Sequence, residues 1–135
     1  MAFYYGSDGE CIENPNEDDL KDIFFHTEAS YWEQGSGDSS IEVDGCDECL
    51  LFFYDEPYGF FMMRHPDYLV PIDRDAAIKT VEHDVGGDPM KVPTCSYVDR
   101  ETAYKIAKEF IETEKIPEFL EWIDLYDIDF DHDYR

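Results

Sequence analysis

Two apolar runs separated by a short turn segment constrain the fold more than any other feature of this sequence. The runs are Leu50–Tyr54 and Phe60–Arg64, and Asp55–Gly59 between them carries the Pro and Gly typical of turns. This pattern predicts a β-hairpin. Because the runs are almost continuously apolar rather than alternating, we expect both faces of these strands to be covered, with helices packed on one side.

Two other segments carry the signals of helices. Asn16 is a capping residue, and it predicts a short helix through about Phe25. Asp99 is the natural cap of a longer helix over Arg100–Glu114, which Pro117 stops. One apolar stripe runs along this second helix, and it consists of Ala103, Ile106, Ala107, Phe110 and Ile111.

Shorter segments complete the expected elements. They are a half-exposed strand at Ile41–Asp44, an edge strand at Tyr68–Ile72, a turn at Asp84–Pro89 and a final strand at Phe119–Ile123 that Leu125 and Tyr126 extend. The first ten residues are either poorly ordered or strand-like. The order of elements predicts an α+β fold. In it, a central antiparallel sheet carries a short N-terminal helix and a longer C-terminal helix on one face, and the last strand follows the helix. Residues 1–135 are expected to form one domain with a frayed, acidic C-terminal tail, residues 127–135.

Net charge constrains the partners of this chain. It has 34 acidic and 10 basic residues and a net charge of −24. Binding to DNA, RNA or anionic lipid would be repulsive, whereas a basic partner would be attracted in a salt-dependent way. Ten Tyr, ten Phe and two Trp indicate a folded scaffold rather than a purely solvating chain. The acids concentrate toward both ends, so they would form one continuous acidic face if the termini lie close together.

The N-terminus gives an expectation about location. It has neither the basic nor the apolar region of a signal peptide, and the longest apolar runs are too short to span a membrane. We therefore expect a cytoplasmic protein, with no membrane partner, whose four cysteines are reduced thiols.

The pair Cys46 and Cys49 has the spacing of a metal or redox motif. A zinc site requires a second pair or two suitably spaced histidines, and the sequence offers neither. Asp47 and Glu48 between the cysteines are expected to raise the thiol pKa values, the opposite of what a redox motif needs. The simpler interpretation is two ordinary thiols at the start of a strand.

Other catalytic or ion-binding patterns are incomplete. His83 could be a general base oriented by a neighbouring carboxylate, but no nucleophile motif accompanies it, and we expect a solvated loop residue. Asp127–Asp133 alternates acids as a calcium loop does, but it lacks the glycine and the glutamate of an EF-hand. No phosphate-binding loop or basic cluster occurs. We therefore predict no catalytic, cofactor-binding or metal-binding residues, no cofactor and no nucleic-acid partner.

A set of short motifs covers the C-terminal third. They are Gly86-Gly87, Val98–Ala103, Ala107–Phe110, Thr113–Pro117 and Trp122. This arrangement resembles the immunity proteins of bacterial polymorphic-toxin systems, in the family often paired with deaminase toxins. It covers about residues 85–125, and more loosely the hairpin. Many relatives have Gly after the Thr, where this chain has Glu114.

The resemblance implies a non-catalytic antitoxin that binds one cognate toxin in the producing cell and blocks its active site. Such toxins, deaminases or nucleases, act on nucleic acid and have basic clefts, which an acidic and aromatic surface would fit. Exposed acids and aromatics on loops are the predicted contacts: Glu56, Tyr58, Glu82, Asp84, Asp88, Tyr126 and Asp127. Ala103, Phe110 and Trp122 are expected in the core instead. Two alternatives remain open, a nucleic-acid mimic that inhibits a DNA-binding enzyme, and an enzyme or metal module built on Cys46, Cys49 and the histidines.

Overall fold

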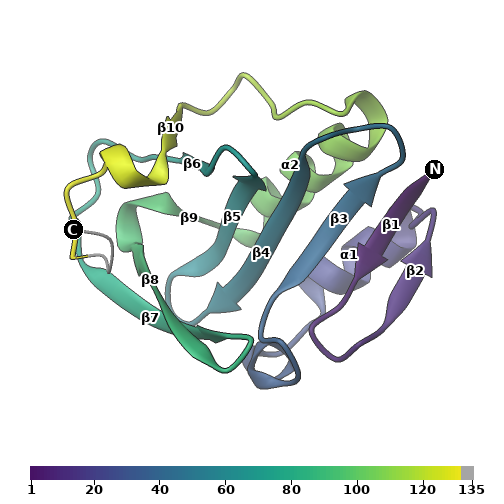
Figure 1. The fold of residues 1–135 in the computed structure, drawn as a ribbon, viewed down its shortest axis with the longest axis horizontal. Coiled ribbons are helices and arrows are strands. Elements are labelled where there is room, and N and C mark those ends of the chain that lie inside the picture. The colour runs from purple at the N-terminus through teal and green to yellow at the C-terminus, as the bar shows by residue number, and fades with distance from the viewer. Residues whose placement is uncertain (132–135) are drawn as a thin grey trace.

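The fold is an antiparallel sheet, with strands of different lengths, that carries two α-helices on one side (Figure 1). The computed structural model describes residues 1–131. Its strands are β1 (Ala2–Tyr5), β2 (Cys11–Glu13), β3 (Ser39–Val43), β4 (Cys49–Asp55), β5 (Gly59–His65), β6 (Leu69–Pro71), β7 (Thr80–Val85), β8 (Asp88–Pro93), β9 (Tyr97–Val98) and β10 (Trp122–Asp124). Its α-helices are α1 (Glu17–Phe25) and α2 (Arg100–Thr113), and its 3-10 helices are η1 (Ala29–Glu33), η2 (Thr94–Ser96) and η3 (Leu125–Asp127).

The main sheet has the strand order β10-β6-β5-β4-β3-β1-β2, with β9 on β5, while β7 and β8 form a separate hairpin. Helices α1 and α2 lie side by side behind the main sheet in Figure 1. The last strand of the sheet, β10, follows α2. The predicted α+β architecture is therefore confirmed. None of the helices in residues 1–131 combines the length and hydrophobicity that crossing a bilayer requires.

Both helices begin where the sequence predicts, because a side chain at each N-terminus accepts a hydrogen bond from the first turn of the helix. The Asn16 side chain accepts a hydrogen bond from the Asp19 backbone N–H at 2.8 Å, and the Asp19 carboxylate accepts one from the Asn16 N–H at 2.9 Å. Asp99 caps α2 by accepting from the Thr102 N–H at 2.7 Å. The second helix ends when Glu114 adopts a left-handed conformation with φ 62°.

The core lies between the helices and the central hairpin. Strands β4 and β5 pair in register, with Phe52 opposite Met62 and Phe53 opposite Phe61. Alternate residues of the two strands face the helices, where five fully buried aromatic rings contact one another: Tyr4, Phe24, Trp32, Phe52 and Phe60. Burial of each such side chain contributes roughly 1.5–3 kcal/mol. This aromatic layer closes the helix side of the sheet.

Two strand predictions need correction at the β6 edge. The segment predicted as an edge strand forms β6, but β10 lies outside it, with Trp122 opposite Pro71. The final strand is also shorter than predicted, because the Asp124 side chain accepts from the Tyr126 N–H at 2.9 Å and turns the chain into η3. Trp122 is half-buried and donates its indole N–H to the Pro117 carbonyl at 2.9 Å rather than lying deep in the core.

Three further segments are more ordered than the sequence indicates. The first residues form β1, which pairs with both β2 and β3. The predicted turn at Gly86-Gly87 is confirmed, but it joins two six-residue strands, β7 and β8, that were not predicted. The tail is not frayed through residue 131, because Ile128 and Phe130 are both buried in the core. Residues 132–135 of the predicted tail lie outside the described residues.

The two acidic ends of the chain do not meet. Strands β1 and β2 lie at one edge of the main sheet, and β10 lies at the opposite edge. A single acidic face made from both termini is therefore ruled out for the described chain, and the acids of each end must be considered separately.

Candidate partner-binding face

One face of the main sheet is only partly covered. Tyr4, Ile41, Leu50 and Met62 point toward the helices and are fully buried, so their neighbours along each strand point to the opposite face. On that face, cross-strand pairing aligns two rows of side chains. The first row is Phe3, Glu42, Cys49 and His65, and the second is Tyr5, Ser40, Leu51 and Met63. This is the side of the sheet turned toward the viewer in Figure 1.

We call the accessible part of these rows the open face, and its residues are Phe3, Tyr5, Glu42, Cys49, Leu51 and His65. Tyr5 is 41% exposed, Glu42 and His65 are exposed, and the other three are half-buried. The rings of Phe3 and Tyr5 lie 6.2 Å apart and nearly parallel. The open face thus presents aromatic and aliphatic surface to solvent, which central sheet faces normally bury against another layer.

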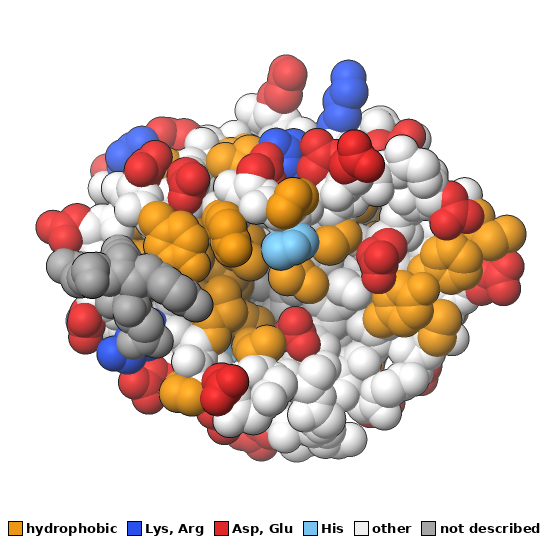
Figure 2. Space-filling model, viewed as in Figure 1, with side chains coloured by type: hydrophobic (Ala, Val, Ile, Leu, Met, Phe, Trp, Pro, Cys, Tyr) orange, Lys and Arg blue, Asp and Glu red, His pale blue; other side chains and the backbone are white. Residues whose placement is uncertain are grey.

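Acidic groups border this surface. A hollow of about 460 Å³ at its end is lined by residues of the open face and by the β3–β4 turn, which contributes Asp44, Asp47 and Glu48. Within residues 1–131, Glu42, Asp44 and Asp47 form no ion pair. Figure 2, viewed from the same side, shows hydrophobic side chains in two groups, one around and left of the middle and one toward the right, with acidic side chains between them and along the rim. The hollow therefore brings the rings of Phe3 and Tyr5 together with a mostly polar wall that carries unpaired negative charge.

The β7–β8 hairpin covers the adjoining part of the same face. The His83 ring lies flat on Phe53, with ring centroids 4.0 Å apart. His83 Nδ1 lies 2.7 Å from Asp55 Oδ1, and Tyr97 donates its hydroxyl to Asp55 Oδ2, also at 2.7 Å. The other ring nitrogen, Nε2, lies 2.7 Å from the Gly37 carbonyl oxygen. The buried His83 side chain therefore fastens the hairpin to β4 and to the 34–38 loop, and Tyr97 shares the Asp55 carboxylate with it. The Gly86 N–H adds a second contact to this loop by donating to the Ser36 carbonyl at 2.8 Å.

The charge state of His83 follows from these contacts. Both ring nitrogens face hydrogen-bond acceptors, and only the doubly protonated ring can donate to both, so these contacts favour the imidazolium cation. Burial alone would lower the pKa of His83, but the hydrogen bonds to Asp55 and to the Gly37 carbonyl outweigh burial and raise the pKa above its ordinary value. With neither nitrogen free to accept a proton, His83 is not placed to act as a general base. The expectation of a solvated loop histidine is wrong, because its side chain is only 7% exposed.

This cation makes stability pH-dependent. Its folded-state pKa is raised, so its contribution is fully present below the unfolded pKa of about 6.5 and is lost as pH rises through the folded value. We expect the free energy of unfolding to fall as pH rises from about 6.5 through the raised folded-state pKa, by about 1.4 kcal/mol for each unit by which the pKa is raised. Urea unfolding across this range measures it. The His83→Gln variant should lack this component, and equal slopes for the two proteins would contradict the assignment.

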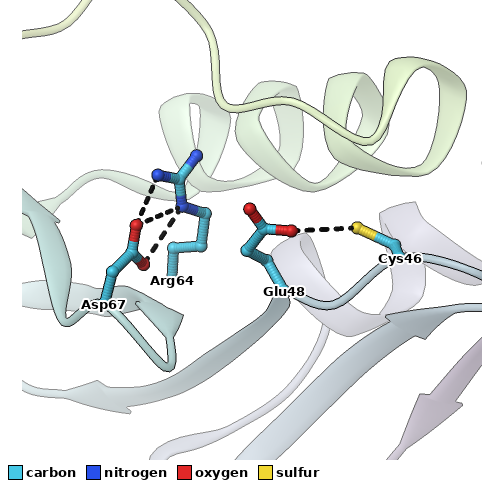
Figure 3. Close-up of polar contacts among 4 residues, drawn as sticks. All are labelled: Cys46, Glu48, Arg64 and Asp67. Atoms are coloured by element: carbon cyan, nitrogen blue, oxygen red, sulfur yellow. Dashed lines mark hydrogen bonds and ion pairs between the residues drawn. The ribbon is translucent and has the colours of Figure 1, made fainter.

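Within residues 1–131, the thiols of Cys46 and Cys49 belong to no cluster of side chains that could hold a metal ion. The Cys46 thiol donates to Glu48 at 3.6 Å, while Arg64 is held by Asp67, with Nε 3.1 Å from Oδ2 (Figure 3). Burial raises the pKa of both Cys46 and Cys49, and the charge of Glu48 adds to the effect at Cys46, in the direction predicted from the sequence. No three His, Cys, Asp or Glu side chains of the described residues are placed to hold a metal ion.

Comparison with known families identifies the chain. Residues 26–124 match the family described as Immunity protein Imm1. The chain belongs to this family of immunity proteins. Membership implies a toxin protein as its partner and confirms the predicted resemblance to immunity proteins. No curated protein matches the sequence.

The match to the Imm1 family begins at His26, so the first 25 residues of this Imm1 protein lie outside it. It includes β3, β4 and β5, which supply most of the open face, and it ends with β10. Strands β1 and β2 and the whole of α1 lie before it, so Phe3 and Tyr5 come from a segment outside the match.

All seven predicted contact residues of this Imm1 protein are exposed. Five of them gather near one end of the sheet: Glu56 follows Asp55, Glu82 and Asp84 flank His83, and the Asp55–His83 contact joins the two segments. Tyr58 belongs to the same turn as Glu56 and packs on Tyr97, and Asp88 begins β8. Tyr126 and Asp127 lie elsewhere, because Tyr126 packs on Tyr68, beyond the opposite end of β5. The seven therefore form two groups rather than one surface, and their role as contacts remains a prediction.

Sequence reasoning missed the residues of the open face. Part of the signal was present in the alternation of Ile41-Glu42-Val43, which places Glu42 opposite buried Ile41. Residues 2–5 do not alternate in polarity, so only their strand conformation places Phe3 and Tyr5 opposite buried Tyr4. What the sequence does not show is that β1 pairs with β3, and only this pairing brings the two aromatics beside Glu42.

Proposed function

We propose that this Imm1 protein binds its cognate toxin and blocks a toxin active site that acts on nucleic acid, such as that of a deaminase or a nuclease. The observation that carries the proposal is the excess of 34 acidic over 10 basic residues on a folded, aromatic-rich scaffold. An enzyme that binds a polyanion needs a basic cleft. An acidic protein is attracted to the same cleft and competes with the substrate for it.

The proposed action is stoichiometric inhibition without turnover, in the cytoplasm of the producing cell. The one buried histidine–carboxylate pair among the described residues has both ring nitrogens occupied, so it supports the fold rather than chemistry. The partner is a protein, and the negative charge disfavours nucleic acid as a direct ligand. Family membership favours this role over a general nucleic-acid mimic, because an immunity protein is matched to a particular toxin.

Co-production in cells tests the proposal. The toxin domain encoded beside the gene of this chain is expressed alone, with this protein, or with an unrelated folded protein of similar net charge. We expect growth arrest in the first and third cases and growth equal to that of a toxin-free culture in the second. In vitro, the purified protein should inhibit that toxin and leave an unrelated nuclease active. Failure to protect would contradict the proposed function, and inhibition of both enzymes would indicate a mimic instead.

A further inference from the structure

We propose that the open face is the surface that receives the toxin, and that its occupant is a basic toxin loop that inserts an arginine beside Phe3, Tyr5 and Glu42. This inference rests on the proposed function and deepens it by naming the contact surface and the chemistry of the partner segment. The open face is defined by Phe3, Tyr5, Glu42, Cys49, Leu51 and His65.

The first argument is that apolar sheet surface is left accessible. The neighbouring part of the same face is closed by His83 on Phe53, whereas Leu51 and Phe3 remain half-buried and Tyr5 is 41% exposed. A monomer gains stability by covering such surface, and apolar patches rimmed by charged groups mark sites of protein association. The hollow of about 460 Å³ gives the patch a concave shape that suits a protruding loop.

The second argument is the chemistry of the walls. Guanidinium groups stack on aromatic rings and pair with carboxylates through two parallel hydrogen bonds. Phe3 lies directly opposite Glu42 across β1 and β3, so a ring and a carboxylate lie side by side on the same row. Asp44 and Asp47 add negative charge at the rim and form no ion pair within the described chain. An arginine with an apolar stem suits these walls better than a lysine, whose ammonium cannot stack in the same way.

The third argument discriminates between this surface and its main rival. A groove beside the β4–β5 turn is also aromatic and acidic, with Phe25, Tyr54, Tyr58, Asp99 and Glu101 in its wall, but Arg100 lines it too. The Arg100 guanidinium lies 4.3 Å from the centre of the Tyr54 ring and donates to the carbonyls of Phe24 and Thr27. That groove already contains its own cation, which would repel a second one. The lining of the hollow beside the open face contains no Lys or Arg.

Charge-reversing variants test the inference with the toxin domain encoded beside the gene as the probe. The double variant Tyr5→Ala/Glu42→Lys removes one ring and reverses one charge in the open face, and we expect its Kd for the toxin domain to rise by at least about 100-fold. The matched control is Phe119→Ala/Glu118→Lys, which makes the same change of charge at exposed residues near the opposite edge of the sheet. Its Kd should change by less than about 5-fold, which reflects the altered net charge alone.

A third variant, Tyr58→Ala/Glu56→Lys, tests the rival surface. The tyrosines at positions 5 and 58 are both 41% exposed, so the two variants remove equally accessible rings. If this variant loses as much affinity as the open-face variant or more, or if the open-face variant binds normally, the inference is overturned. Unchanged melting temperatures and circular dichroism establish that each variant is folded.

Hydrogen exchange on the complex of unaltered proteins gives an independent readout. We expect slower amide exchange in β1, β3 and the β3–β4 turn when the toxin domain is bound. Protection confined to the β4–β5 turn and the β7–β8 hairpin would leave the proposed function standing and refute the open face as the contact. Absence of any complex would instead contradict the proposed function itself.

Discussion

Replacement of Asp55 by alanine is expected to lower the free energy of unfolding by about 3–5 kcal/mol. The carboxylate accepts from His83 Nδ1 and from the Tyr97 hydroxyl, both at 2.7 Å. Its loss leaves two donors without partners and a buried cation without its counter-charge. Because the free energy of unfolding of a whole domain is only about 5–15 kcal/mol, this single substitution should remove a large part of it. Urea unfolding monitored by tryptophan fluorescence measures the loss.

A surface ion pair provides the control for Asp55. Both carboxylate oxygens of Asp67 accept from the Arg64 guanidinium, but the Asp67 side chain is 40% exposed. Asp67→Ala should therefore cost no more than about 1 kcal/mol. Asp55→Asn keeps one acceptor oxygen and should fall between the two. If Asp55→Ala and Asp67→Ala lose the same free energy, the network around His83 does not hold the hairpin in the way its geometry indicates.

The Asp55 substitution should also change the pH profile. Without the carboxylate, burial dominates and the pKa of His83 should fall, so the loss of stability as pH rises above about 6.5 should largely disappear. A variant that is destabilised but keeps the original pH profile would point to a repacked hairpin rather than to a lost counter-charge.

Features of the fold that depend on local chemistry were predictable from the sequence. Asn16 and Asp99 cap helices because their side chains reach backbone N–H groups three residues ahead, a contact that needs no knowledge of the rest of the chain. The central hairpin was predictable because two apolar runs around a Pro/Gly turn have few other ways to be buried.

Features of the fold that depend on contacts between distant parts of the chain could not be predicted from the sequence. Strand β8 includes Pro89 and Pro93, and neither β7 nor β8 is a continuous apolar run. The hairpin is held by the contact of His83 with Asp55, 28 residues away. The open face depends on register, because Phe3 becomes part of a site only through its position opposite Glu42. The sequence predicted that exposed acids would matter but not which ones would share a surface with aromatics.

The second large effect concerns the speed of toxin binding. A partner with a basic cleft should be steered toward a protein of net charge −24. Association rate constants for such pairs reach about 10⁸–10⁹ M⁻¹s⁻¹ at low salt, compared with about 10⁵–10⁶ M⁻¹s⁻¹ without steering. Salt shortens the Debye length from about 30 Å at 0.01 M to about 3 Å at 1 M, which removes the long-range attraction. Dissociation depends on short-range contacts and should change much less.

Negative charge on this scaffold is proposed to serve docking into a positively charged toxin cleft, and stopped-flow mixing with the toxin domain measures that directly. Between about 0.02 M and about 0.5 M salt, we expect the association rate constant to fall by about 100-fold while the dissociation rate constant changes only a few-fold. An association rate constant that stays constant over this range would contradict electrostatic docking, whatever the affinity of the complex.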